Sequence, residues 1–291
     1  MGNMGEILRE VKQLVGEGYE VFLEKREKNN GVEHQYIRIH DPEMGMGMGI
    51  SIQMDVILEA IESGEISIQD AAAKINRFYK EKNNMGEVNG ITSCLNKDYA
   101  LENVIYQLVN KEKNRNLLHR SPHKDFLDLA VVYRLIVEEG SNGISSIAVT
   151  DEFCGRYSIS RGELDAAARR NTVKRGFCRQ SLSSLLDLLC NMPENSGEVP
   201  MWVLTNLGNF CGAAVMLYKE CFSALANELE SDLYILPSSI HEVIAVPAMD
   251  LKPEFLKETV GEINTSVVSA EEVLSDSVYK YNRNDGTLFI A

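Results

Sequence analysis

The sequence lacks the features of a membrane-inserted or secreted protein. Its 291 residues contain no apolar run of about eighteen or more, the length that a transmembrane helix needs. Residues 1–6 have neither the basic start nor the apolar stretch of a secretory signal. We therefore expect a cytoplasmic protein with no membrane partner.

Metal and cofactor motifs are also missing. No two of the six cysteines have the C-x-x-C spacing of metal and redox sites; they are Cys94, Cys154, Cys178, Cys190, Cys211 and Cys221. The sequence contains no phosphate loop, dinucleotide fingerprint or zinc-protease motif. We expect reduced thiols in the core, no metal and no cofactor.

Positive charge is scarce. Lysine and arginine number 29, against 43 aspartate and glutamate residues, which gives a net charge of -14 at pH 7. A surface with this balance repels phosphate backbones and anionic lipids, so nucleic acid is disfavoured as a partner. The apolar share of 44% is that of a globular protein with a buried core.

Residues 1–82 have the pattern of an αβββαα module. An apolar helical face runs from Met4 to Val15, alternating strands begin at Tyr19 and Val32, and helices begin at Asp55 and Ser67. Double-stranded RNA-binding domains share the order of one helix, three strands and a helix, but they need basic contacts to phosphate. Residues 1–85 carry 15 acidic and 10 basic residues, so we do not expect this module to bind RNA.

Two segments, one within this module and one directly after it, have an irregular pattern. Methionine and glycine alternate from Met44 to Gly49, which predicts a loop leading into the third strand through Ile50 and Ile52. An adaptable binding surface and a soft-metal site are the alternatives for this tract. Residues 83–96 have no sustained periodicity and two glycines, so we predict a linker there.

Residues 97–291 are predicted to form a larger α+β domain. We expect a long helix from Lys97 and a central helix from Pro122, because Ser121 is a favoured N-cap and residues 126–137 are nearly all apolar. A strand at 144–150 and a helix opened by Ser160 and Glu163 should follow. Basic residues at the end of that helix complement its dipole: Arg169, Arg170, Lys174 and Arg175.

The sequence pattern of the last third of the chain predicts a β-β-α-β-β unit in a mixed or antiparallel sheet. The expected strands cover 201–205, 212–217, 233–236 and 240–246, with a helix at 219–229. Helices from Pro253 and Ser269 should pack on this sheet. The chain should close with a hairpin that turns at Asp285 and Gly286.

Several strings in this part resemble an uncharacterised bacterial family. They are VLTN at 203–206, GAA at 212–214, LY at 217–218, LYILPSSIHEV at 233–243 and AEEVLSD at 270–276. A middle block is similar too, with N-x-x-x-N at 110–114, PH at 122–123 and F-x-D-L-A at 126–130. The family is a domain of unknown function in Gram-positive gut bacteria, so the resemblance implies no activity.

His241 and Glu242 are the first candidates for a site. In a strand they would point to opposite faces, and Glu242 would share a face with an apolar stripe that raises a carboxyl pKa. Asn206 or Ser239 would then have to supply a catalytic partner. The alternative, which we favour, is that His241 and Glu242 bind backbone around the Pro237 turn, and that Ser239 belongs to the turn.

A second candidate is a local basic patch that would bind an anion at the start of the helix expected near Ser121. It comprises Lys111, Lys113, Arg115, Arg120 and Lys124. The alternative, which we favour, is a solvated helix face that balances Glu102 and Glu112.

Three functions remain as hypotheses. The leading one is a non-catalytic cytoplasmic binding or accessory protein, because no nucleophile, base and orienting group are suitably spaced. The second is a hydrolase or transferase for an anionic small molecule that uses His241 or Glu242 with the basic patch. The third is a mobile-element protein whose acidic surface binds a host partner.

Overall fold

The computed structural model describes residues 2–41, 49–84, 96–140, 143–182, 200–237, 239–249 and 251–291. Most of the methionine–glycine tract, most of the expected linker and Ser238 lie outside these residues. No helix of the described residues is long and apolar enough to span a membrane. The fold is α+β, as predicted.

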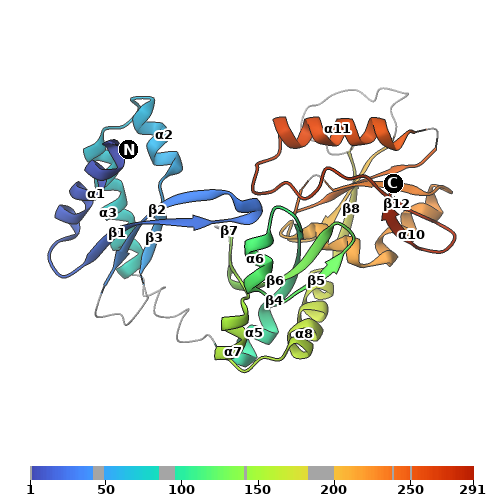
Figure 1. The fold of residues 1–291 in the computed structure, drawn as a ribbon, viewed down its shortest axis with the longest axis horizontal. Helices are drawn as coiled ribbons and strands as arrows, with labels where there is room; N and C mark the ends of the chain where they lie inside the picture. Colours follow the sequence, from blue (N-terminus) through green and yellow to red (C-terminus); the bar gives the residue numbers. More distant parts are fainter. Residues whose placement is uncertain are drawn as a thin grey trace. The chain divides into compact units, whose positions relative to one another are not determined.

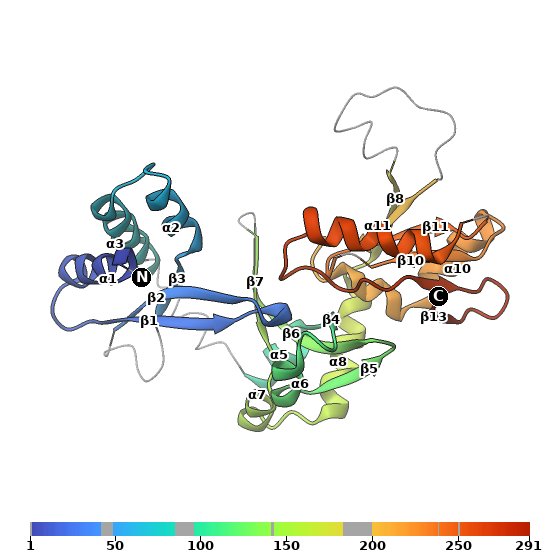
Figure 2. The same cartoon turned by 45° about the horizontal axis from the view of Figure 1, so that its top comes forward.

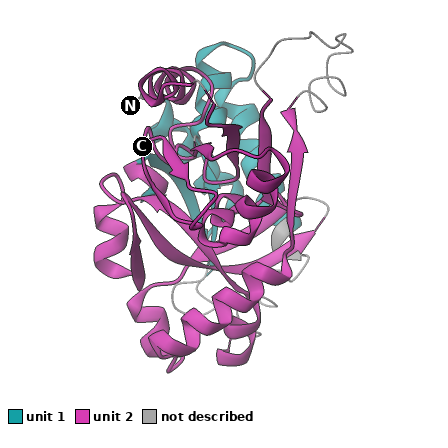
Figure 3. Cartoon of the chain, turned by 90° about the vertical axis from the view of Figure 1, so that its right-hand side faces the viewer, with its two compact units in different colours: residues 1–28, 32–95 teal, residues 29–31, 96–291 magenta. Residues whose placement is uncertain are grey.

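The chain divides into two compact units, which Figure 3 shows in two colours. The first unit comprises Met1–Lys28 and Val32–Leu95. The second comprises Asn29–Gly31 and Asn96–Ala291. Each unit is described by itself.

The first unit has the expected αβββαα order. Its elements are α1 (Gly2–Val15), β1 (Glu20–Glu27), β2 (Glu33–His40), β3 (Ile50–Gln53), α2 (Asp55–Glu62) and α3 (Ile68–Asn84). The strands form an antiparallel sheet in the order β1-β2-β3, and α1 packs beside α3 (Figure 1). The core includes Ile7, Val11, Ile37 and Ile75, each less than 2% exposed, because the apolar helix faces meet the inner face of the sheet.

The second unit begins with a four-stranded antiparallel sheet. Its elements are α5 (Lys97–Asn103), β4 (Val104–Asn110), α6 (Arg115–Arg120), β5 (His123–Phe126), β6 (Leu129–Gly140), β7 (Gly143–Ala148), α7 (Asp151–Arg156) and α8 (Arg161–Lys174). The long strand β6 pairs with β4 along one edge, and with β5 and then β7 along the other. Helix α8 packs against β4 (Figure 2).

Two helices predicted for this sheet are wrong. The helix from Lys97 ends at Asn103, and the residues after it form β4. Ser121 follows the end of α6 instead of starting a helix. The residues predicted to form the central helix form β5 and β6. An apolar run that is buried on both faces has neither the helical nor the strand period, and valine and isoleucine then favour the strand.

A six-stranded antiparallel sheet completes the second unit. Its strands are β8 (Phe177–Ser181), β9 (Trp202–Asn206), β10 (Leu233–Leu236), β11 (Val243–Pro247), β12 (Tyr279–Tyr281) and β13 (Leu288–Ile290), in the order β13-β12-β10-β11-β9-β8. Helix α10 (Lys219–Glu228) follows η3 (Gly212–Leu217), and α11 (Pro253–Ser266) crosses the sheet (Figure 1). The β10–β11 and β12–β13 hairpins lie where the sequence predicted them.

Two further elements of this region differ from the prediction. Residues 212–217 form a 3-10 helix instead of a strand, and the helix expected from Ser269 is replaced by a turn at 270–272 and a bridge between Val273 and Ser239. The 3-10 helix is favoured because Gly212, Ala213 and Ala214 are buried where the backbone lies close to β9.

Asp128 connects the two sheets of the second unit. It lies in the turn between β5 and β6, and its Oδ2 accepts hydrogen bonds from the hydroxyls of Ser275 (3.0 Å) and Ser277 (2.8 Å). Its Oδ1 accepts a bond of 2.5 Å from the hydroxyl of Tyr279 in β12. Burial and this bond raise the pKa of Tyr279, so the phenol remains a donor.

Gly212 has the least space for a side chain among the described glycines. A Cβ on this residue would lie 2.0 Å from Thr205 Oγ1 and 2.2 Å from the backbone oxygen of His241. These two atoms also form a hydrogen bond of 2.8 Å with each other. Any side chain at position 212 therefore separates η3 from both β9 and the loop before β11.

We predict that Gly212→Ala lowers the free energy of unfolding by about 3 kcal/mol, because overpacking displaces backbone as well as a side chain. Gly261→Ala is the matched control, since nothing lies within 4 Å of its Cβ position in α11. It should raise the free energy by up to about 1 kcal/mol through helix propensity. Urea unfolding measures both, and equal effects of the two changes would contradict the tight contact.

Candidate functional site

The best-defined polar cluster of the second unit surrounds Asp165 on α8. The sequence starts this helix through a capping box, in which Ser160 Oγ accepts from the backbone nitrogen of Glu163 and the Glu163 carboxylate accepts from that of Ser160. Leu164 and Ala168 are buried and hold the helix on the sheet. Asp165 and Arg169, four residues apart, lie on one side of the helix.

Three strands supply the other members of the cluster. Tyr106 of β4 lies directly opposite Tyr133 of β6, and the two ring centroids are 5.8 Å apart. Lys124 of β5 is paired with Val131, two residues from Tyr133, so both side chains project from the same face of the sheet. Strand register therefore gathers residues that are far apart in sequence.

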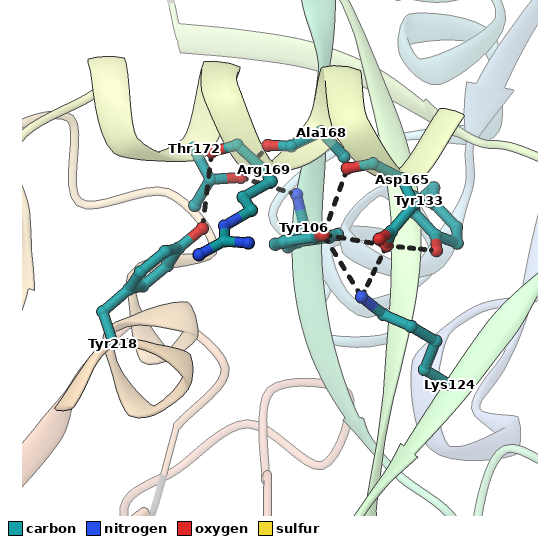
Figure 4. A network of polar contacts seen from close by, with 8 residues as sticks. All are labelled: Tyr106, Lys124, Tyr133, Asp165, Ala168, Arg169, Thr172 and Tyr218. Atoms are coloured by element: carbon teal, nitrogen blue, oxygen red, sulfur yellow. Dashed lines mark hydrogen bonds and ion pairs between the residues drawn. The ribbon is translucent and has the colours of Figure 1, made fainter. Parts of the chain in front are cut away.

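The Asp165 carboxylate is the common acceptor of this cluster (Figure 4). Its Oδ1 accepts hydrogen bonds from the hydroxyls of Tyr106 (2.8 Å) and Tyr133 (2.9 Å). The same oxygen lies 2.5 Å from Lys124 Nζ, which also lies 3.2 Å from the Tyr106 hydroxyl and 4.8 Å from the centre of its ring. One carboxylate thus fixes the side chains of three strands. We call these four residues the Asp165 cluster.

The contacts of the cluster move the pKa of its carboxyl group and of its two phenols away from neutral pH. Burial alone would raise the pKa of Asp165, but the bonds from Lys124, Tyr106 and Tyr133 outweigh it and lower the pKa. Burial, and then the bond to Asp165, raises the pKa of both Tyr106 and Tyr133. At neutral pH the carboxylate is therefore ionised and the phenols are protonated.

A cavity of about 380 Å³ lies beside the cluster. Its lining combines apolar and aromatic groups with four charged ones: Tyr106, Lys124, Asp125, Phe126, Val131, Asp165, Arg169, Leu217 and Tyr218. Burial raises the pKa of Tyr218 to about 12, so this phenol is neutral as well. We call this space the Asp165 cavity.

The charges that line the cavity are paired, with one exception. Asp125 lies 2.7 Å from Lys111 Nζ, and Lys124 is paired with Asp165. No carboxylate of the described residues lies within ion-pair distance of Arg169, whose side chain Figure 4 shows between Tyr106 and Tyr218. Among the described residues, the cavity therefore presents one cation, Arg169, that has no carboxylate partner and can bind an anion.

A general acid or base works best with a pKa near the working pH. In the cluster, the pKa of Asp165 is lowered and the pKa values of Tyr106 and Tyr133 are raised, which moves all three away from that range. Burial also raises the pKa of the thiols of Cys211, to about 12, and Cys221, to about 11, which makes both weak nucleophiles. Among the described residues, no three His, Cys, Asp or Glu side chains gather as a metal site would require.

His241 and Glu242 do not line the Asp165 cavity. They lie in the loop before β11, whose backbone contacts Gly212 at the start of η3. The strand β11 begins at Val243, so both residues precede it and the predicted strand 240–246 is too long. His241 Nδ1 accepts from the backbone nitrogen of Cys211 (3.3 Å), and its Nε2 lies 3.7 Å from Glu272. Glu242 is partly exposed and forms no hydrogen bond or ion pair with a described residue.

Ser239 and Asn206 bind backbone in the same region. Ser239 Oγ accepts from the backbone nitrogen of His241 (3.0 Å). The Asn206 side chain accepts from the backbone nitrogens of Gly208 (3.0 Å) and Phe210 (3.3 Å) and donates to the Phe210 carbonyl (2.7 Å). The structure brings these candidates near His241, but their polar atoms hold the loops in place.

The predicted basic patch does not converge on one point. Lys111 pairs with Asp125, Arg115 with Glu112 and Lys124 with Asp165. Lys113 and Arg120 form no ion pair with a described residue. No helix begins near Ser121, so the helix N-terminus on which the anion-site alternative depended is wrong, and of the five only Lys124 lines the Asp165 cavity.

Sequence reasoning missed the other members of the cluster. Tyr106 and Tyr133 fell within helices that are in fact strands, so their pairing was hidden. One signal was present: Asp165 and Arg169 are four residues apart on a helix whose capping box was recognised. Arg169 had been assigned to the helix dipole instead.

We predict that Asp165→Asn lowers the free energy of unfolding by about 1–3 kcal/mol at pH 7, because it weakens the acceptor of two phenols and a lysine. Asp125→Asn removes an ion pair whose carboxylate is more exposed, so it should lower the free energy of unfolding by less than Asp165→Asn does. Unfolding in urea compares the two. Equal losses would contradict the role of Asp165.

The pH dependence has a definite sign. The pKa of Asp165 is lower in the folded than in the unfolded chain, so its contribution is complete above the ordinary carboxyl value and is lost as pH falls through the folded value. The difference between wild type and Asp165→Asn, largest at pH 7, should therefore shrink below about pH 4. A difference that grows on acidification would contradict this sign.

Comparison with known proteins places the chain in one family. No curated protein and no solved structure matches it. The model of one protein family, described as a family of unknown function, matches residues 4–283, a range that covers most of both units and every residue of the Asp165 cavity. The predicted relationship to an uncharacterised family is confirmed. The chain belongs to DUF5688, a family of unknown function.

Proposed function

We propose that the protein is a non-catalytic cytoplasmic binding protein and that its ligand occupies the Asp165 cavity. The observation that carries this proposal is the Asp165 cluster, in which one ionised carboxylate accepts from two phenols and a lysine. Side chains fixed in this way form a preorganised wall, which lowers the entropic cost of binding.

The composition of the cavity supports the same conclusion. Apolar side chains such as Phe126, Val131 and Leu217 supply contact area, and a few polar groups supply orientation. Ligand sites generally combine these two elements, with volumes of roughly 300–1,000 Å³. The Asp165 cavity, at about 380 Å³, lies near the lower end, so the proposed ligand is small.

A hydrolase or transferase based on His241 or Glu242 has less support. Such an enzyme needs a basic side chain and a space for substrate beside one of these residues. The charged side chain within ion-pair distance of His241 is the acidic Glu272, and neither candidate lines the Asp165 cavity. We therefore propose binding without chemistry.

We expect native mass spectrometry of the full chain, purified from its own cells, to detect a non-covalent small-molecule adduct. Leu217→Trp should remove the adduct because the larger side chain fills the cavity that Leu217 lines. Val267→Trp, at a position that is 77% exposed, should retain it. Wild-type protein without an adduct, or an adduct that survives Leu217→Trp, would count against the proposal.

A further inference from the structure

We propose that the Asp165 cavity binds a small aromatic monocarboxylate, with Arg169 binding the carboxylate and the aromatic side chains of the cavity contacting the ring. This inference rests on the proposed binding function and adds the chemical class of the ligand. It follows from the charges, the walls and the position of Arg169.

The charge balance selects a single negative charge. Asp125 is paired with Lys111 at 2.7 Å and Lys124 with Asp165 at 2.5 Å, so Arg169 is the cation of the lining that has no carboxylate partner among the described residues. An added carboxylate would complete the pairing through charge-assisted hydrogen bonds. A cationic ligand would lack a free acidic partner in this lining.

A doubly charged ligand fits the cavity less well. Asp125 and Asp165 both line the space, and the pKa of each is lowered, so both remain ionised at neutral pH. A phosphate dianion would bring its second charge towards these carboxylates, and among the described residues the lining has no second cation without a carboxylate partner. Like charges in a site of this size oppose binding, so a monoanion is favoured.

The walls favour a flat apolar body. The rings of Tyr106, Phe126 and Tyr218 line the space together with Val131 and Leu217. Both tyrosine hydroxyls are engaged, since Tyr106 donates to Asp165 and Tyr218 lies 3.5 Å from the backbone oxygen of Arg169. The rings therefore offer their faces and edges, which pack well against an aromatic ring.

Figure 4 shows the Arg169 guanidinium between Tyr106 and Tyr218. A planar guanidinium can bind both oxygens of a carboxylate and leave the attached ring beside the tyrosines. A lysine at this position would keep the charge but lose the two-point contact. The geometry thus assigns recognition of the anion to Arg169 and recognition of the ring to the aromatic wall.

Isothermal titration of the full chain with 3-phenylpropanoate tests the inference. Its neutral amide lacks the charge, and propanoate lacks the ring. We expect 3-phenylpropanoate to bind at least tenfold more tightly than either. An amide or a propanoate that binds equally well would overturn the proposed ligand class.

Substitutions test whether Arg169 recognises the carboxylate of the ligand. Arg169→Gln should weaken binding of 3-phenylpropanoate at least tenfold and abolish its advantage over the amide, and Arg169→Lys should retain part of that advantage. Arg170→Gln is the matched control, because Arg170 is the adjacent residue of α8 but does not line the cavity. It should leave binding unchanged. Retention of the full advantage by Arg169→Gln would overturn the assignment.

The outcomes separate this inference from the binding function. If 3-phenylpropanoate fails to bind and Leu217→Trp still removes a native adduct, the ligand class is wrong and the binding function stands. If Leu217→Trp binds 3-phenylpropanoate as well as wild type does, the assignment of this ligand to the Asp165 cavity is wrong. Binding that is lost in both Leu217→Trp and Arg169→Gln, but kept in Arg170→Gln, supports the inference.

Discussion

The carboxylate of Asp165 is the interaction on which the candidate site depends. It joins α8 to β4, β5 and β6 through Tyr106, Lys124 and Tyr133. Each of these contacts would be weak if it were isolated and exposed, but together they restrict one another. The result is a rigid polar wall beside an apolar space, with Arg169 one helical turn away.

The motifs that are most distinctive in the sequence have a different role. Asp128 of the F-x-D-L-A block accepts from Ser275 of the AEEVLSD block, and Asn110 donates to the backbone oxygen of Leu274 (3.1 Å). The backbone oxygen of His241, in the PSSIHEV tract at 237–243, lies beside Gly212 of the GAA string, and Ser239 Oγ accepts from the backbone nitrogen of His241. Strings that are far apart in sequence thus meet at junctions of the second unit, where they fix the two sheets.

The sequence predicted elements where the pattern was local. The helix face from Met4, the Ser160 capping box and the β10–β11 hairpin each depend on residues that are near one another in the chain, and each is present. The strands β4 and β6 could not be distinguished from helices, because burial on both faces removes the periodicity. The pairing of Tyr106 with Tyr133 depends on strand register, which no local pattern specifies. The Asp165 cavity was therefore beyond sequence reasoning, although Lys124 had been noted as basic.

The central claim is that the Asp165 cluster is set for binding and not for proton transfer. Carbon-13 NMR of the full chain, labelled at aspartate carboxyl and tyrosine ring carbons and assigned with Asp165→Asn, Tyr106→Phe and Tyr133→Phe, tests it directly. The account predicts that none of the three resonances titrates between about pH 5 and 8, since the acid remains ionised and the phenols protonated. A titration midpoint near neutral pH for any of them would contradict the account and indicate a site prepared for acid–base chemistry.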